Sequence, residues 1–360
     1  MVRQLLAIAT IGLSVLLVAS AYIGLLNPAH WWLLPALGFA YTWLMLLTAV
    51  WATCLLLLRP KLALVPALAM ICTIPSLLLH LRLPGSRDQS SSAPLKLISY
   101  NVRNFDLYNW SQEGVLLEKI IKQISDQRPD VACFQEFFHA DSGVFRTIDR
   151  LQRDCGLPYY AVDKTVEREN YGFWGLAVFS RHPIVYQRAL RFGNKTFNSA
   201  LLCGLSVAGD TLWVLNVHLQ SIALEDPDYS YLQQVGSELD FDVGSLRSIA
   251  RKLLHGFRTR PHQAERVHAL LDSLSGPVVL CGDFNDTPGS YVYRLLTRKL
   301  KDAFLQAGSS GLGKTYAGVI PMLRIDYILV NEQIEVNHFE VSRQKLSDHY
   351  LICCRLSVKP

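Results

Sequence analysis

The first 87 residues of the chain contain no aspartate or glutamate, although they carry five basic residues. Only 18% of the whole chain is charged and half of it is apolar, which excludes an intrinsically disordered protein and makes a purely soluble one unexpected. The eight cysteines form no CxxC pair and no Cys/His zinc spacing, so we expect buried free thiols. The chain has no internal repeat.

The charge balance differs between the two parts of the chain. Because the first 87 residues hold five basic residues and no acid, the other 273 hold 30 of each sign, and the net charge of +5 belongs to the N-terminal part. A neutral downstream part argues against tracking a nucleic-acid backbone by bulk charge. The length of 360 residues predicts about two structural units.

Long apolar runs dominate the N-terminal part. Each is about 20 residues or longer, the length that spans a hydrocarbon core of roughly 30 Å. They cover residues 5–26, 31–58 and 62–81. Pro66 and Pro75 interrupt the third run, which membrane helices tolerate. We therefore predict a transmembrane anchor over residues 1–83, with no charged residue inside a span to mark an ion pathway.

A cleaved signal peptide is the alternative for the first run. Arg3 supplies a basic start, and Ala19-Ser20-Ala21 fits the small-residue cleavage pattern. The second and third runs would still anchor the protein.

The basic residues predict the orientation of the anchor. Arg3 precedes the first run, and Arg59 and Lys61 separate the second from the third. Basic residues favour the cytoplasmic side, so three spans would place everything after Leu81 outside the cytoplasm. We thus expect an integral protein of the cell inner membrane whose domain after Leu81 is extracytoplasmic.

Residues 84–94 predict a flexible linker, and strands alternate with helices after it. Periodicity and breakers predict helices over 113–127 and 261–273. They predict strands over 95–100, 131–134, 175–179, 211–219, 277–281, 325–330 and 350–356. This is an α/β pattern without the regular βαβ order of a doubly wound sheet. Residues 221–260 form a long mixed insertion between a strand and a helix.

Acids, amides and imidazoles gather at the ends of these strands. They are Asn101, Glu136, His218, Asp283, Asn285, Asp326, Asp348 and His349. Strand ends bring distant parts of a chain into one site. Each residue alone could be a turn, a cap or a buried imidazole. As a set, their oxygens suit Mg²⁺ or Mn²⁺, and the two histidines suit phosphate contacts or proton transfer.

The motifs around these residues resemble the endonuclease/exonuclease/phosphatase superfamily. They are LISYNVRNF (around 98–105), DVACFQE (130–136), GLAVFSRHPI (175–184), NVHLQS (216–221), VVLCGDFNDTP (278–288), RIDYILV (324–330) and SDH (347–349). The resemblance covers about residues 95–357 and implies a DNase I-like four-layer α/β/β/α sandwich over residues 95–360.

The resemblance also implies a role for each residue. Glu136 would be the principal ligand of Mg²⁺ or Mn²⁺, with Asn101 beside it and Asp348 on the same cation. Asp283 would orient or deprotonate the attacking water, and Asn285 would help to hold it. His349, oriented by Asp326, would contact the scissile phosphoryl group, and His218 would be a further phosphate-side residue. The number of cations stays open.

One motif matches a different chemistry. Gly308–Thr315 satisfies the P-loop pattern GxxxxGK[ST]. A P-loop follows an apolar strand and opens a helix, and neither is expected here. We expect a glycine-rich loop beside the site instead, with Thr315 and Tyr316 on the substrate side.

The catalytic set predicts the reaction class and leaves the substrate open. A neutral domain on a membrane anchor favours a lipid or small phosphate ester, with the bilayer itself as a partner. A membrane-anchored nuclease is the alternative, to which the basic stretch at 251–260 would contribute unless it is a solvated helix face. A catalytically silent, membrane-tethered binding module is the alternative of another class.

Overall fold

The computed structural model describes residues 1–28, 31, 34–85, 95–108, 114–193, 196–221, 231 and 242–359. The chain forms two compact units. The helical unit comprises Met1–Arg82, Ile222–His262 and Asp286–Leu295, and the sandwich unit comprises Leu83–Ser221, Gln263–Asn285 and Leu296–Pro360. The division of the sequence into anchor, linker and catalytic domain stays a prediction. Most of the expected linker and most of the first half of the 221–260 insertion lie outside the described residues.

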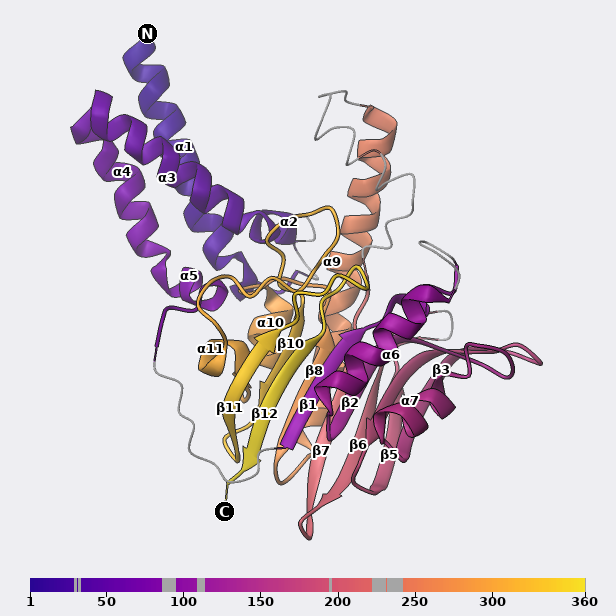
Figure 1. Cartoon of the computed structure of the whole chain (residues 1–360). Helices are drawn as coiled ribbons and strands as arrows, with labels where there is room; N and C mark the ends of the chain where they lie inside the picture. Colours follow the sequence, from indigo (N-terminus) through magenta and orange to yellow (C-terminus); the bar gives the residue numbers. More distant parts are fainter. Residues whose placement is uncertain are drawn as a thin grey trace. The chain divides into compact units, whose positions relative to one another are not determined.

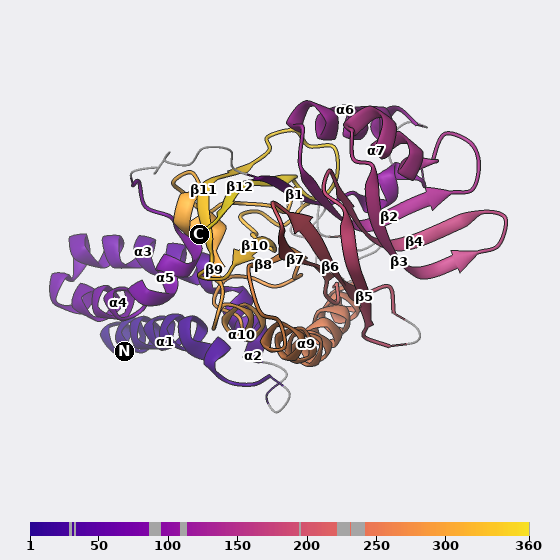
Figure 2. The ribbon, with the colours of Figure 1, turned by 90° about the horizontal axis from the view of Figure 1, so that it is seen from below.

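The helical unit begins with a group of apolar helices. They are α1 (Val2–Tyr22), the short η1 (Ile23–Leu25), α2 (Leu34–Phe39), α3 (Tyr41–Leu58), α4 (Pro60–Cys72) and α5 (Ile74–His80). Helices α1, α3 and α4 lie side by side (Figures 1 and 2). Leu17, Tyr41 and Ala69 form part of the small core between them.

Two of these helical segments are long and apolar enough to cross a membrane. They are Val2–Leu25 and Tyr41–Leu58. The second run therefore spans less than the predicted 31–58, because α2 is a separate short helix. The third run is bent by 56° between α4 and α5 and counts as a span only if the bent pair is taken together. Pro75 is the second residue of α5, directly after the break, and its missing N–H accounts for the break.

The sandwich unit contains two six-stranded sheets (Figure 1). The first sheet has the order β11 (Ile334–Val341), β12 (Ile352–Val358), β1 (Leu95–Asn101), β2 (Val131–Ala140), β4 (Gly172–Ser180) and β3 (Tyr159–Arg168). The second has the order β5 (Ile184–Arg191), β6 (Ser199–Val207), β7 (Asp210–His218), β8 (Val278–Asp283), β10 (Asp326–Val330) and β9 (Lys301–Asp302). Pairs β1–β2 and β7–β8 are parallel, and the others are antiparallel.

Alternation along the strands builds the layers of the sandwich. Val131 and Cys133 are buried in the core shared by strands of both sheets. Ala132 and Phe134 point to the other face and pack with α6 (Val115–Gln127) and α7 (Thr147–Cys155). A period of two along one strand thus serves two cores. The predicted mixed α/β sandwich is confirmed.

Helix α9 (Val243–Asp272) corrects one expected boundary. The sequence predicted a helix start at Pro261, but the helix runs through this proline. Pro261 removes one backbone hydrogen bond, and buried Ile249 and Phe257 keep the first half of the helix in place. The remaining short helices are η2 (Arg103–Asp106), α10 (Tyr291–Leu296) and α11 (Ala303–Ala307).

Candidate active site

Strand ends place the polar residues of the sandwich unit together. Asn101, His218 and Asp283 are the last residues of β1, β7 and β8, and Asp326 is the first residue of β10. In the second sheet, Asp283 is the register partner of His218 on one side and of Asp326 on the other. All four side chains are buried. The backbone alone therefore brings an imidazole and two carboxylates to one end of this sheet.

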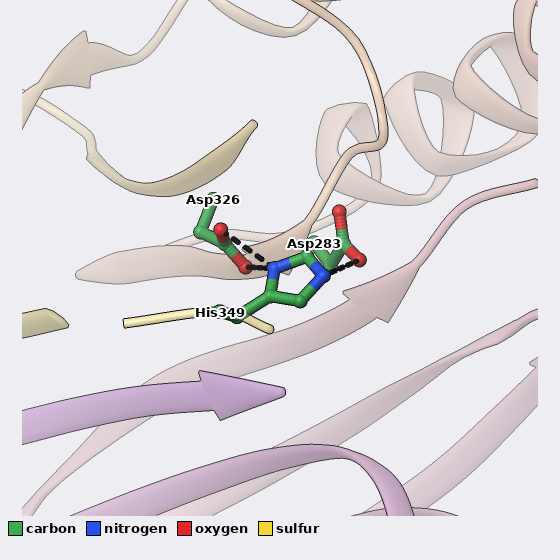
Figure 3. A group of neighbouring side chains, drawn as sticks. All are labelled: Asp283, Asp326 and His349. Carbon is green, nitrogen blue, oxygen red and sulfur yellow. Dashed lines mark hydrogen bonds and ion pairs between the residues drawn. The ribbon is translucent and has the colours of Figure 1, made fainter. Parts of the chain in front are cut away.

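His349 lies between two of these carboxylates (Figure 3). Its Nδ1 is 3.1 and 3.0 Å from the two oxygens of Asp326, and its Nε2 is 3.7 Å from Oδ2 of Asp283. Tyr316 forms a backbone bridge with His349 and packs its ring edge-on against the imidazole. The ring of His349 is thus fixed in orientation, with one nitrogen bound and the other directed at Asp283.

These contacts determine the charge states of His349 and Asp283. Burial alone would lower the pKa of His349, but the carboxylates of Asp326, Asp283 and Asp348 raise that pKa well above its ordinary value. Burial raises the pKa of Asp283 to about 6, against the opposing effect of His349. At neutral pH the site therefore holds an imidazolium beside an ionised carboxylate.

Glu136 lies at a break in the β2–β4 ladder. The register shifts between Phe134 and Phe137, and Glu136 has a φ of +48°, so its carboxylate leaves the regular alternation. Nδ2 of Asn101 donates to Oε1 of Glu136 at 3.3 Å and to Oδ2 of Asp283 at 3.1 Å. One amide therefore joins a carboxylate of the first sheet to one of the second.

His218 and Asp348 complete the cluster. Nε2 of His218 is 3.8 Å from Oε1 of Glu136 and from Oδ2 of Asp283, and it has no hydrogen-bond partner among the described residues. Burial lowers the pKa of His218, which favours the neutral ring. Oγ of Ser347 lies 2.9 Å from the carbonyl of Asn101 and 3.1 Å from Oδ1 of Asp348, and so fixes this acid beside the end of β1.

The comparison with protein families decides the affiliation of this sandwich. Residues 98–349 match the model of the Endonuclease/Exonuclease/phosphatase family. The chain belongs to this family. Members of the endonuclease/exonuclease/phosphatase superfamily are hydrolytic phosphoesterases. A second model, a domain of unknown function, matches residues 3–79.

Solved structures of the endonuclease/exonuclease/phosphatase family share the fold. A family protein from Leptotrichia buccalis superposes with a TM-score of 0.50 at 18% identity, over 73% of this chain and 99% of that one. One from Beutenbergia cavernae gives 0.52 at 19%, over 74% and 72%. The human nocturnin catalytic domain, with a bound sulfate anion, gives 0.50 at 19%, over 74% and 94%. No curated protein matches the chain.

The donor set of this family site fits a divalent cation. Burial, and then the negative charge of Asp348, raise the pKa of Glu136. Two carboxylates that repel each other, with the side chain of Glu136 one-third exposed, suit Mg²⁺ or Mn²⁺, which take oxygen ligands. Asn101 has its Oδ1 turned to the backbone N–H of Arg103 and presents its amide hydrogens to the carboxylates. In this structure Asn101 therefore aligns the acids, and its predicted place as a ligand stays a prediction.

A second group also has the composition of a metal site. Ligand atoms of Asp283, Asp326 and His349 all lie within 4.8 Å of one another. However, Nδ1 of His349 is already bound to Asp326, and a protonated imidazole is a poor ligand. Glu136 with Asp348 therefore fits the cation better.

The remaining predicted residues lie close to this cluster. Asn285, with φ of +53°, donates its backbone N–H to Oδ1 of Asp283 at 2.8 Å and its amide to the carbonyl of Leu219 at 3.0 Å. Oγ1 of Thr315 accepts the backbone N–H groups of Ile325 and Asp326 at 3.0 Å. Thr315 is fully buried and supports Asp326, and the substrate contact expected of it and of Tyr316 stays a prediction. No helix follows the P-loop-like segment within 311–325, as expected.

Sequence reasoning missed a polar network beneath the site. Nε2 of Gln135 donates to Oδ1 of Asn216 at 2.6 Å, and Nδ2 of Asn216 donates to the carbonyls of Phe134 and Ala177 at 2.9 and 3.1 Å. These two buried amides link β2 and β4 of the first sheet to β7 of the second. The signal was present in the sequence, since each amide stands directly beside or two residues from a predicted site residue, Glu136 or His218.

Proposed function

We propose that the chain is a divalent-cation-dependent phosphoric ester hydrolase, tethered to a membrane, that cleaves a phosphodiester or phosphomonoester by attack of water. The observation that carries this proposal is the position of the His349 imidazole. Its Nδ1 lies 3.0 Å from Asp326 and its Nε2 lies 3.7 Å from Asp283. The carboxylate of Glu136 belongs to the same cluster through its hydrogen bond from Asn101. A charged donor, a base and an oxygen-rich cation position thus meet in one buried cluster of a phosphoesterase fold.

Each of the acidic residues has its own role in the proposed hydrolysis. A phosphate ester resists attack because its own negative charge repels nucleophiles. Mg²⁺ or Mn²⁺, held by Glu136 and Asp348, would neutralise the charge that builds up on the phosphoryl oxygens. Asp283, ionised above pH about 6, accepts a proton from water.

The two histidines face the phosphoryl group in different charge states. His349 donates from Nε2 as an imidazolium whose orientation Asp326 fixes through Nδ1. His218, neutral and without a hydrogen-bond partner at Nε2 among the described residues, provides a second donor there. Asn285 keeps Asp283 in place through its backbone N–H.

Charge and the N-terminal helices favour a lipid headgroup or another small phosphate ester as the substrate. Residues 88–360 carry equal numbers of acidic and basic residues, and two or three apolar helices precede them. A nuclease activity is the second candidate. It is favoured by Arg247, Arg251 and Arg258, which are exposed and spaced along one side of α9.

The test is hydrolysis of bis(p-nitrophenyl) phosphate by the full chain in lipid nanodiscs, with EDTA, Mg²⁺ or Mn²⁺. We expect metal-dependent turnover that falls by about 10²–10³ in Asp283→Asn and His349→Ala. Asp126→Asn, which removes an exposed carboxylate of α6, is the matched control and should keep full activity. A folded wild-type chain that hydrolyses neither this diester nor p-nitrophenyl phosphate with any cation would instead be the silent binding module.

The same turnover assay then separates the substrates. Hydrolysis of short-chain phospholipids at a higher kcat/KM than of a single-stranded or duplex oligonucleotide supports a lipid ester. The reverse order supports the nuclease, and Arg251→Gln should then weaken oligonucleotide binding.

The side of the membrane depends on the number of spans. Basic residues at Arg3, Arg59 and Lys61 favour an N-terminus inside, so three spans would put the sandwich unit outside the cytoplasm at the inner membrane. Two spans would return it to the cytoplasm. Alkaline phosphatase fused after Pro360 should be active for three spans, whereas a fluorescent green fluorescent protein fusion at the same place would show two.

A further inference from the structure

The boundary between the two compact units falls directly after Asn285, which ends the short segment 283–285 that we call the catalytic loop. Asp283 and Asn285 belong to the sandwich unit, and the next residues, Asp286–Leu295, belong to the helical unit with the N-terminal helices. We propose that the helical unit holds this segment so that the preceding loop keeps Asp283 aligned, and that Gly24 and Arg294 are positioning residues for the reaction. This inference rests on the proposed function.

A close backbone approach joins the segment to the end of the first apolar helix. A Cβ added at Gly24, in η1, would lie 1.9 Å from the carbonyl oxygen of Gly289. Gly289 has a φ of +85°, which a residue with a side chain adopts only with strain. The turn after the catalytic loop therefore rests on η1 backbone to backbone, and only glycine at position 24 permits it.

Arg294 ties the same turn to the C-terminal end of α1. Its Nε donates to the carbonyl of Gly289 at 2.9 Å, and its Nη2 donates to the carbonyl of Ala21 at 3.3 Å and to Oγ of Ser76 at 3.5 Å. Ser76 also donates to the carbonyl of Ala21 at 2.7 Å. The last carbonyl groups of a helix lack hydrogen-bond donors within the helix, and the helix dipole favours a positive charge near them. The guanidinium of Arg294 supplies both the donor and the positive charge.

A buried ion pair holds the first residue of the segment. Nε of Arg260 lies 3.4 Å from Oδ2 of Asp286, and the two side chains are 1% and 10% exposed. The guanidinium of Arg260 also lies over the ring of Phe257 at 5.0 Å. The basic stretch at 251–260 is therefore not simply a solvated face, because its last arginine is buried beside the residue that follows Asn285.

The contacts of segment 286–295 affect catalysis through the backbone N–H of Asn285. Asn285 is in the left-handed region, and its N–H donates to Oδ1 of Asp283, so the direction of that carboxylate depends on the backbone at 284–286. A shift of Asp286 or Gly289 would turn this N–H away. Misplacing a catalytic group by about 1 Å costs on the order of 10² in rate even when the change is remote.

Two variants of the full chain in nanodiscs test the proposal, each with a matched partner. Gly24→Ala introduces the clash with Gly289, whereas Gly12→Ala places a methyl in the same helical segment where nothing lies within 4 Å. Arg294→Met removes the donors to Ala21 and Gly289, and Arg294→Lys retains one cationic donor. All chains are first compared by thermal unfolding, and kcat and KM for bis(p-nitrophenyl) phosphate are then measured.

We expect Gly24→Ala and Arg294→Met to lower kcat about tenfold or more while KM stays within about twofold. Arg294→Lys should recover part of kcat, and Gly12→Ala should match the wild type. Amide hydrogen exchange of the peptide covering 284–290 should be faster in the first two variants at equal thermal stability. Wild-type kcat and exchange in Gly24→Ala and Arg294→Met, or an equal loss in Gly12→Ala, would overturn the inference.

The outcomes also separate this inference from the proposed function. Wild-type turnover that Asp283→Asn abolishes, with Gly24→Ala as active as the wild type, contradicts only the positioning role. Absence of wild-type turnover contradicts the proposed function. Exchange of the 284–290 peptide then still decides whether the helical unit holds the loop.

Discussion

Replacing Asp326 by asparagine isolates the electrostatic part of the site. Both carboxylate oxygens lie 3.0–3.1 Å from Nδ1 of His349, and Asp326 is first among the charges that raise the pKa of this imidazole against its burial. Asparagine keeps the size of the side chain and removes the charge, so the pKa of His349 falls and its Nδ1–H is left with a neutral acceptor in place of a carboxylate. We expect kcat to fall by about 10²–10⁴ with little change in KM.

The structure also predicts how this change combines with loss of the imidazole. The Asp326 side chain acts on the reaction through His349, so Asp326→Asn should add less than about twofold to the effect of His349→Ala. The assay is kcat for bis(p-nitrophenyl) phosphate by the full chain in nanodiscs at saturating Mg²⁺. Asp126→Asn again serves as the control for loss of one carboxylate.

Two results would refute this reasoning. An Asp326→Asn chain as fast as the wild type would show that the imidazole needs no charged partner. If the double variant Asp326→Asn/His349→Ala were a further tenfold slower than His349→Ala, Asp326 would have a role independent of His349. Because a carboxylate oxygen of Asp326 lies within 4.8 Å of one of Asp283, that role would be binding of a cation shared by the two acids.

Three further results are expected. The kcat/KM should rise with pH through about 6 and then level off, because burial raises the pKa of Asp283 to about 6 and only its ionised form accepts a proton. Bound Mg²⁺ would shift this rise to lower pH. A fall of kcat/KM between pH 5 and 7 contradicts Asp283 as the base. EDTA should abolish turnover, and Glu136→Gln should raise the Mg²⁺ concentration for half-maximal rate by more than roughly tenfold; turnover that persists in EDTA contradicts the metal role. Arg324→Met should lower the free energy of unfolding by about 3–5 kcal/mol, since it leaves the 2% exposed carboxylate of Asp302 buried without its guanidinium. Thermal unfolding should show the loss, with Arg324→Met/Asp302→Leu more stable than Arg324→Met, and an unchanged midpoint in the single variant contradicts it.

Strand ends were the part of the site that the sequence predicted best. The strands predicted over 95–100, 211–219 and 277–281 end within two residues of Asn101, His218 and Asp283, the last residues of β1, β7 and β8, because a polar side chain after a buried strand marks the sheet edge. The sandwich itself was implied by the resemblance of the motifs to the endonuclease/exonuclease/phosphatase superfamily. Strands β3, β5 and β11 were not predicted, since their residues are largely exposed or only partly buried and lack a continuous apolar run. No range was predicted for β6 either, although most of its residues are buried.

Contacts between distant segments could not be predicted in this way. The positive φ of Glu136 arises from a register shift against β4, which no local pattern encodes. The pairing of Gln135 with Asn216 depends on two sheets meeting face to face. Likewise, a proline such as Pro261 ordinarily marks a helix start. The burial of Phe257 and Arg260 explains why α9 begins well before this proline.

The composition of the helical unit has a practical consequence for anyone who wishes to express a soluble fragment. A chain that begins after Arg82 keeps Asp286–Leu295 and the first half of α9 but loses the helices against which they pack. Val292 and Phe257, now 1% and 2% exposed, would face water, and Arg294 would lose the carbonyl of Ala21. Such a fragment would present a newly uncovered apolar surface on the segment that follows Asn285 in the sequence, so aggregation or low activity in it would say little about the intact chain.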